Sequence, residues 1–333
     1  MRRLLSLIII LTVLWCGWWW IASSTITRVI SAQIEQLRIQ GWQIDAPVPA
    51  TNGFPFDLRQ TYASLQLTSP DNITVEIPAL TLNAKAYWPG HATVSVANTP
   101  VSMTQSGTPV LFIQFTDAKA TLRLRPGPAF ELQDVSLQSG PWQINAPTGN
   151  LLSANDLLTT LTQITSARAT YSFTVQATDL SPGDLIRSTL QTPPDAPLAF
   201  DAYTANGAVQ FDKALDRHLL NGHMPRPIQF ALNKAEITWG TLNLSSTADM
   251  TIDATGTPDG TITAKVQNWQ KLLEYAERAG AITAGQRGQS KLMLGIFANM
   301  SGTPDDIELT VRAANGQLNI NGIGLGPVPK LFR

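Results

Sequence analysis

From Tyr62 onward, apolar and polar residues alternate at every second position through most of the chain. A strand with this period has one face for a core and one for water, as in antiparallel sheets. Proline- and glycine-containing sequences such as "SPDN", "WPGH" and "RPGP" separate the alternating segments, as turns do. We therefore predict a mainly β (α+β) body of long curved antiparallel sheets built from β-hairpins. The clearest segments are Leu80–Trp88, Ala118–Leu124, Tyr171–Ala177, Ile228–Leu232, Ile262–Val266 and Ile307–Val311.

Two of the turn sequences are near-copies of each other. "TGTPDG" (Thr255–Gly260) and "SGTPDD" (Ser301–Asp306) each lead into an alternating strand. The pair suggests a reused hairpin module, although two short copies do not establish a repeat.

Charge and cysteine content exclude several classes of protein. Charged residues are 14% of the chain, against about 25% in ordinary soluble proteins. Lysine and arginine number 23 and aspartate and glutamate 24, so the net charge is −1, with no long like-charge run. No nucleic-acid footprint is therefore expected. Cys16 is the only cysteine, so the body has no disulfide or thiolate metal site. A bacterial lipidation signal needs a small residue directly before the cysteine, and Trp15 occupies that position. We therefore expect Cys16 to be a buried membrane-facing thiol and not a lipidation site.

The N-terminus predicts a signal anchor over residues 1–22. Arg2 and Arg3 precede a mostly apolar run from Leu4 to Ile21, and eighteen helical residues rise about 27 Å, close to the hydrocarbon thickness. The arginines favour a cytoplasmic N-terminus, with the rest of the chain across the membrane. Cleavage after "IASS" is the alternative. The predicted anchor residues are Leu4, Leu7, Ile10, Leu14 and, at the headgroup end, Trp18, Trp19 and Trp20.

A second helical segment is expected over residues 23–41. Ile26, Val29, Ile30, Ile34 and Leu37 recur at three and four residues, and Gly41 supplies a C-terminal stop. This juxtamembrane amphipathic helix is predicted to continue the anchor and to pack on the body.

The stretch "TNGFPFDLRQ" follows this helix and precedes the first clear strand. Gly53 permits unusual backbone angles, and Pro55 favours an extended Phe54. We interpret Gly53, Phe54, Pro55 and Phe56 as a structural hinge. Both phenylalanine rings are expected to point into the body.

Helical spacing predicts four further helices between the strands. One covers Ser153–Thr165, a short one runs from Ser181 to Leu190, and two make a helical hairpin over residues 268–300 that covers an open sheet face. The proline-rich "LQTPPDAPLAF" (Leu190–Phe200) predicts a boundary between β-rich units 42–190 and 191–333. A long surface loop is the alternative interpretation of the same stretch.

No motif for catalysis is present. The chain lacks the serine elbow, the zinc-protease helix and the phosphate loop, and "NGIGLG" (Asn321–Gly326) precedes "PVPK" rather than a helix, which suits a bulge and turn. His91 is expected in a tight turn, and His218 and His223 in exposed loops. A metal site formed by His218 and His223 with Asp216 is the alternative. We predict no enzyme activity, no catalytic residues, no cofactor and no metal.

Several segments together resemble a known family. They are "GWQIDAP", "NGFPFDLR", "IPALTLNAKAYWPGHATVSV" and the terminal "GQLNINGIGLGPVPK". In this order after a short anchor, the chain resembles the proteobacterial envelope family called domain of unknown function 2125. More distantly it is similar to the AsmA-like envelope proteins, whose tails end in a comparable pattern.

The resemblance implies a periplasmic β-rich body held by a single-pass helix in the inner (cytoplasmic) membrane. AsmA-like relatives are associated with phospholipid traffic and have curved sheets with apolar inner grooves. This body is much shorter than the bridging relatives, which puts spanning the periplasm in doubt. The expected partners are inner-membrane lipid and a phospholipid or other apolar ligand in a sheet groove. The alternative is a non-catalytic scaffold that recruits an envelope protein partner.

Overall fold

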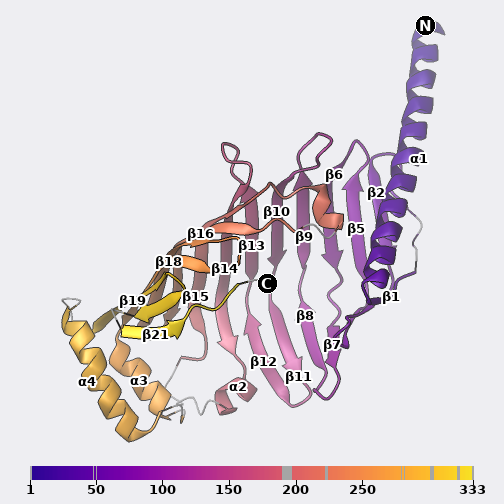
Figure 1. Cartoon of the computed structure of the whole chain (residues 1–333). Helices are drawn as coiled ribbons and strands as arrows, with labels where there is room; N and C mark the ends of the chain where they lie inside the picture. Colours follow the sequence, from indigo (N-terminus) through magenta and orange to yellow (C-terminus); the bar gives the residue numbers. More distant parts are fainter. Residues whose placement is uncertain are drawn as a thin grey trace. The chain divides into compact units, whose positions relative to one another are not determined.

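A computed structural model describes residues 2–47, 49, 51–189, 197–221, 224–278, 280, 282–300, 304–320 and 323–331. Within this part the chain is mostly antiparallel β-structure with few helices, as predicted (Figure 1). The chain divides into two units, Met1–Gly140 and Pro141–Arg333. This boundary differs from the one predicted at the proline-rich Leu190–Phe200, whose residues 190–196 lie outside the described part.

The described residues of the first unit form one helix and ten strands in two antiparallel ladders. The strand orders are β1-β3-β4-β7-β8 and β2-β5-β6-β9-β10. The elements are α1 (Arg2–Ile39), β1 (Gln43–Asp45), β2 (Asp57–Tyr62), β3 (Leu65–Thr68), β4 (Ile73–Ile77), β5 (Leu80–Lys85), β6 (Trp88–Val96), β7 (Val101–Gln105), β8 (Leu111–Phe115), β9 (Lys119–Leu124) and β10 (Leu132–Ser139).

The two ladders arise because long strands of one meander are interrupted in the middle. Pro78 lies between β4 and β5, and Pro100 lies between β6 and β7; proline cannot donate to a ladder. Between β8 and β9, Asp117 has a φ of 53° and its N–H donates to the Asn98 side chain (2.8 Å). Each hairpin therefore contributes to both ladders, with its turn at one end of the unit.

The second unit contains a nine-stranded antiparallel meander, β13 to β21, in which each strand pairs with the next. A shorter ladder joins β11, β12 and the end of β14. The elements are β11 (Trp142–Ala146), β12 (Gly149–Ala154), β13 (Leu157–Gln163), β14 (Thr170–Pro182), α2 (Asp184–Thr189), β15 (Phe200–Phe211), the 3-10 helix Arg217–Asn221, β16 (Pro227–Trp239), β17 (Leu242–Ile252), β18 (Pro258–Gln267), α3 (Trp269–Arg278), α4 (Ala284–Met300), β19 (Asp306–Ala314), β20 (Gln317–Ile320) and β21 (Ile323–Pro327).

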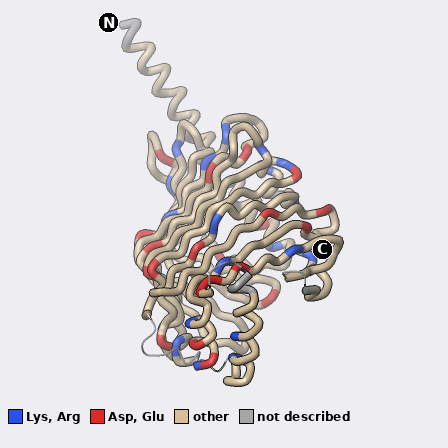
Figure 2. The backbone as a smooth tube through the Cα atoms, turned by 90° about the vertical axis from the view of Figure 1, so that its left-hand side faces the viewer, with Lys and Arg blue, Asp and Glu red and all other residues tan. Residues whose placement is uncertain are grey.

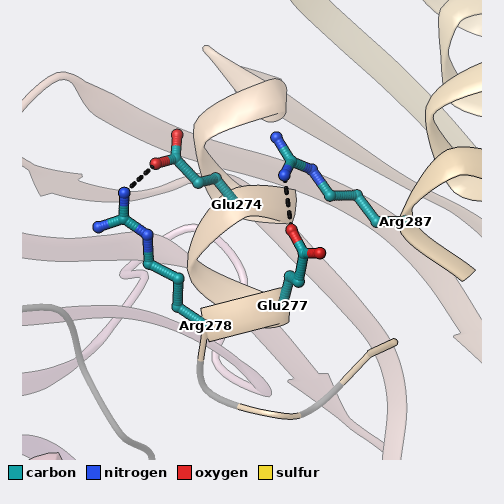
Figure 3. A network of polar contacts seen from close by, with 4 residues as sticks. All are labelled: Glu274, Glu277, Arg278 and Arg287. Atoms are coloured by element: carbon teal, nitrogen blue, oxygen red, sulfur yellow. Dashed lines mark hydrogen bonds and ion pairs between the residues drawn. The ribbon is translucent and has the colours of Figure 1, made fainter. Parts of the chain in front are cut away.

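Most of the predicted helices are present. The amphipathic segment 23–41 forms the second half of α1, and Gly41 follows it with a φ of 93°. The short helix is α2, and the helical hairpin is α3 with α4. Arg287 of α4 forms an ion pair with Glu277 of α3, and Arg278 pairs with Glu274 one turn earlier (Figure 3).

Two sequence-based assignments are wrong. The predicted helix Ser153–Thr165 is instead strand, belonging to β12 and β13, because Thr159, Thr160 and Thr162 favour extended structure and Leu161 pairs with Phe173 of β14. "WPGH" is not a turn: β6 begins at Trp88, and the turn is at Ala86–Tyr87. The bulge between Ala84 and Lys85 in the β5–β6 pairing accommodates the extra residues.

Candidate functional site

Helix α1 is joined to the first unit by three tryptophan side chains. The indole N–H groups of Trp15, Trp18 and Trp19 donate to the backbone carbonyls of Pro55 (3.0 Å), Ala86 (2.8 Å) and Asp57 (3.0 Å), respectively. These acceptors lie at the starts or turns of β2, β5 and β6. The predicted headgroup tryptophans Trp18 and Trp19 therefore hold the body, whereas Trp20 is exposed.

Small side chains let the helix approach the sheet closely. Ala22 is buried against Leu58 of β2 and against Ala84 and Ala86. N-terminal to Trp15 the helix projects from the unit, and Leu5–Leu14 are exposed on every side (Figure 1). This projecting part carries no charged residue after Arg3 (Figure 2). Helix α1 is long and apolar enough to span a membrane.

The segment Gly53–Phe56 is placed beside α1, but its rings are not in the core. Phe54 packs edge-to-face on Trp19 (5.5 Å between centroids) and Phe56 lies near Trp15 (6.4 Å). Their exposed fractions are 54% and 62%, so the expectation that both rings point into the body is wrong. The reason is that α1 occupies the adjacent apolar surface.

Backbone constraints explain the shape of this segment. Gly53 has a φ of 101°, and a Cβ there would lie 2.8 Å from the Asp57 carbonyl oxygen. Asn52 and Arg59 exchange two backbone hydrogen bonds (2.8 and 2.7 Å) that close the loop. The Phe54–Pro55 peptide bond is cis. The segment contacts α1 directly, and a hinge function for it stays a prediction.

A polar cluster lies between α1 and β2. Gln60, 1% exposed, donates from its amide to the hydroxyls of Thr27 and Thr51, both at 2.9 Å, and accepts from the Tyr62 hydroxyl at 3.2 Å. Burial raises the pKa of Tyr62 above its ordinary value. The cluster satisfies its own hydrogen bonds, so it has a structural role in seating the helix.

One face of the β13–β21 ladder in the second unit is lined mostly by apolar side chains. Strand pairing aligns side chains across the sheet, so a row perpendicular to the strands shares one face. We call this surface the apolar face. Its central row is Leu161, Phe173, Gly207, Leu232, Ala248, Ile262, Val311 and Ile320.

The opposite face of the same ladder is polar. The neighbouring row there is Ser172, Ala208, Ala231, Asp249, Thr261, Arg312 and Asn319. Both charge signs are interspersed along the chain, and neither gathers on one segment (Figure 2). The alternation seen in the sequence therefore separates one wet face from one apolar face over the whole meander.

Helices cover one end of the apolar face. Trp269 and Ala298 are buried against Ile307, with Leu309 and Val266 beside them. Nearby, Tyr275 of α3 packs on Leu242 and on the Trp239 ring (5.0 Å between centroids).

A loop covers the opposite end of the strands. Tyr171 there is completely buried, its hydroxyl accepts from the Leu215 N–H (3.0 Å), and its ring packs edge-on against Phe211 (5.9 Å).

The centre of the apolar face is not sealed in this way. Phe173 stacks on Phe230, with 5.6 Å between centroids and 13° between planes, over Gly207, where a Cβ would lie 2.8 Å from the Phe173 ring. Phe173, Phe230 and Leu232 are only half-buried, and Ile262 is 39% exposed. Apolar side chains in a closed core are buried nearly completely, so this row is the candidate binding surface.

The histidines that the structure describes lie in two separate elements. No cluster of three metal-ligating side chains exists in the part of the chain that the structure describes. Asp216 accepts from the backbone N–H of His218 (2.9 Å), as a turn cap does. His91 lies in β6, and His223 lies outside the described residues. The "NGIGLG" glycines belong to β21 with a bulge between Leu318 and Asn319, except for 321–322, which are not described.

Other pKa shifts reflect local pairing. A hydrogen bond with Asp57 raises the pKa of Lys85, and one from Lys234 lowers the pKa of Glu236. The backbone N–H of Thr257 lowers the pKa of Asp253, which precedes the "TGTPDG" turn and organises its start by accepting from the backbone N–H groups of Thr255 and Thr257.

Comparison with models of protein families identifies the family of the chain. The profile of the family described as "Uncharacterized protein conserved in bacteria (DUF2125)" matches residues 18–329. The chain belongs to this family. The match begins at Trp18, within the indole contacts of α1, and continues through β21. No curated protein matches the chain. The more distant AsmA-like kinship stays a prediction.

Proposed function

We propose that this DUF2125 protein is a membrane-anchored protein that holds a lipid acyl chain or a similar apolar molecule on the apolar face of β13–β21. The observation that carries the proposal is the half-buried central row, which crosses eight strands without a charged residue. Removing apolar surface from water stabilises a complex by about 25 cal/mol per Å². An acyl chain lying across this row would bury the apolar side chains that α3 and α4 do not cover.

The composition of the row suits a flexible hydrocarbon. Gly207 and Ala248 lie between the larger Phe173, Leu232 and Ile262, so the surface alternates small and large side chains. Polar groups that would select a headgroup are absent from the row. The proposed ligand is therefore recognised by its hydrocarbon part, with α1 keeping the protein at a membrane from which such molecules come.

Site-specific photocrosslinking in the full chain, in bacterial membranes, tests this proposal. A benzophenone amino acid would replace Ile262 in one chain and Thr261 or Thr263, on the polar face of the same strand, in the matched controls. After irradiation, mass spectrometry of the purified chain should find phospholipid adducts at position 262. The controls should yield severalfold fewer.

Other outcomes would contradict the proposal. Absence of a lipid adduct at 262, or equal adducts on both faces, would show that the apolar face does not hold lipid. A single protein crosslinked at 262 in place of lipid would favour the scaffold alternative, in which the same face binds a partner of the envelope.

A further inference from the structure

Exposed aromatic side chains gather at one end of the first unit. The starts of β2, β6 and β10 and the ends of β5 and β9 meet there because the strands are antiparallel. We call Phe54, Phe56, Tyr87 and Phe130 the aromatic rim. Phe56 and Tyr87 are both 62% exposed, and Phe130 stacks on Trp88 (6.3 Å between centroids).

Helix α1 leaves the body at this same end. The indole bonds to Pro55, Ala86 and Asp57 place the rim loops beside residues 15–19 of the helix. The exposed apolar residues Leu5–Leu14 extend beyond the rim. The rim therefore borders the apolar segment that the proposed function places in the membrane.

The length of the free helix is too short for a bilayer. Leu4–Leu14 rise about 16 Å, whereas the hydrocarbon core is about 30 Å thick. If Arg2 and Arg3 stay at the far headgroups, about twenty helical residues are needed, which reaches Ser23. Trp15 and Trp19 then lie below the near surface of the bilayer, together with the loops that they bind.

Several polar backbone groups of the rim loops have hydrogen-bond partners, as a position inside the bilayer requires. Irregular backbone is tolerated at membrane depth only where its polar groups have partners. The carbonyls of Pro55, Asp57 and Ala86 accept from indoles, and the Phe56 carbonyl accepts from the Ala86 N–H (2.8 Å). Two charged pairs lie beside the rim residues, and both form ion pairs: Asp57 with Lys85 at 2.8 Å and Arg125 with Glu131 at 3.7 Å.

We propose that the aromatic rim is a bilayer-binding surface that enters the headgroup layer and the adjoining hydrocarbon around α1. Aromatic rings favour this layer. The rim thereby fixes the height of the body on the membrane, with Phe56, next to Trp15, deeper than Phe54, next to Trp19. This inference rests on the membrane anchoring in the proposed function and not on a ligand at the apolar face.

Depth measurements by fluorescence quenching test the rim. Cys16→Ser supplies a cysteine-free background, in which Phe56→Cys and Tyr87→Cys each carry an environment-sensitive nitrobenzoxadiazole label. Ile10→Cys reports on the anchor. Ser106→Cys, exposed in the β7–β8 turn at the far end of the unit, is the matched control. The full chains are reconstituted in vesicles of phosphatidylethanolamine and phosphatidylglycerol, with nitroxides on the acyl chains near the headgroup.

Labels at 56 and 87 are expected to lose most of their fluorescence to the nitroxides, while the label at 106 keeps it. Quenching of the label at position 10 without quenching at 56 and 87 would contradict the proposal that the rim binds the bilayer, but would still support membrane anchoring by α1. No quenching at 10 would overturn both. Equal thermal unfolding of the labelled chains shows that the substitutions, all at exposed positions, leave the fold intact.

Discussion

Helices α1 and α3 are attached to their sheets by the same kind of contact, yet they bury very different fractions of themselves. Each uses an indole N–H that donates to a proline carbonyl: Trp15 to Pro55 and Trp269 to Pro304, both at 3.0 Å. On α3, Trp269 and Tyr275 are buried, and Leu273 is partly buried beside Ile307. Helix α1 instead leaves Leu5–Leu14 exposed on every side. Burial of apolar surface is favourable for either helix, so the difference separates a helix that completes a core from one whose N-terminal segment has no cover within its unit.

The largest expected effect tests the exposed half of α1. Leu11→Arg with Leu14→Arg should abolish retention in the membrane fraction after an alkaline wash, because both positions lie near the middle of the proposed span and an arginine costs about 2.5–3.5 kcal/mol at the bilayer centre. Ala32→Arg, exposed on the second half of the helix, should leave retention unchanged. Retention of the double variant would show that the projecting half of α1 does not span the membrane.

The next effect tests the covered helix. Trp269→Ala removes a side chain that is 4% exposed and should lower the free energy of unfolding by about 3–5 kcal/mol, measured by urea titration of the full chain in micelles. The control Trp20→Ala, at an exposed position of α1, should change it by less than about 0.5 kcal/mol. Equal losses would remove the distinction between the two helices.

A smaller effect tests how closely α1 approaches the sheet. Ala22→Leu inserts bulk against Leu58 and Ala84 and should cost about 1–3 kcal/mol of unfolding free energy. Ile21→Leu, which is exposed one position earlier, serves as the control. If Ala22→Leu unfolds like the parent chain, the helix is not seated against β2 and β5.

The smallest effect concerns the polar cluster under α1 and its pH dependence. Tyr62→Phe loses the hydrogen bond to Gln60 and should cost about 0.5–1.5 kcal/mol at neutral pH. The folded pKa of Tyr62 is raised above its ordinary 10.0, so its stabilising contribution is complete below pH 10.0 and is lost as the pH rises through the folded pKa.

Urea titrations at neutral pH and above pH 10.0 measure this change. The parent chain should lose stability more steeply than Tyr62→Phe over the alkaline range, so the gap between them closes. Tyr87→Phe, whose ring is exposed, should follow the parent at both pH values. If the difference in unfolding free energy between the parent chain and Tyr62→Phe stayed constant with pH, folding would not raise the pKa of Tyr62.

Local patterns predicted most of this structure. Alternation identified the strands that form the apolar face, such as Tyr171–Ala177 and Ile262–Val266, because period two is a property of the strand itself. Helical spacing likewise identified α2, α3 and α4. The same reasoning failed at Leu157, Leu158 and Leu161, because their spacing fits both a helix and a strand. Pairing with β14 makes this segment a strand.

The sequence predicted the residues of the candidate surfaces but not how they are arranged. The rings of Phe54 and Phe56 alternate like buried strand residues, and nothing local says that Trp15 and Trp19 occupy the position beside them. The central row of the apolar face joins residues from Leu161 to Ile320, and register between distant strands cannot be read from either strand alone.

By itself the sequence determined the class of fold, the apolar helix at the N-terminus and the separation of apolar from polar faces, because these follow from periodicity along a few neighbouring residues. Only the tertiary structure decided where α1 meets the body, which aromatic rings stay exposed and which part of the apolar face α3 and α4 leave uncovered. Those outcomes depend on contacts between residues far apart in the chain, such as Trp18 with Ala86, and packing selects them only when the whole unit is assembled.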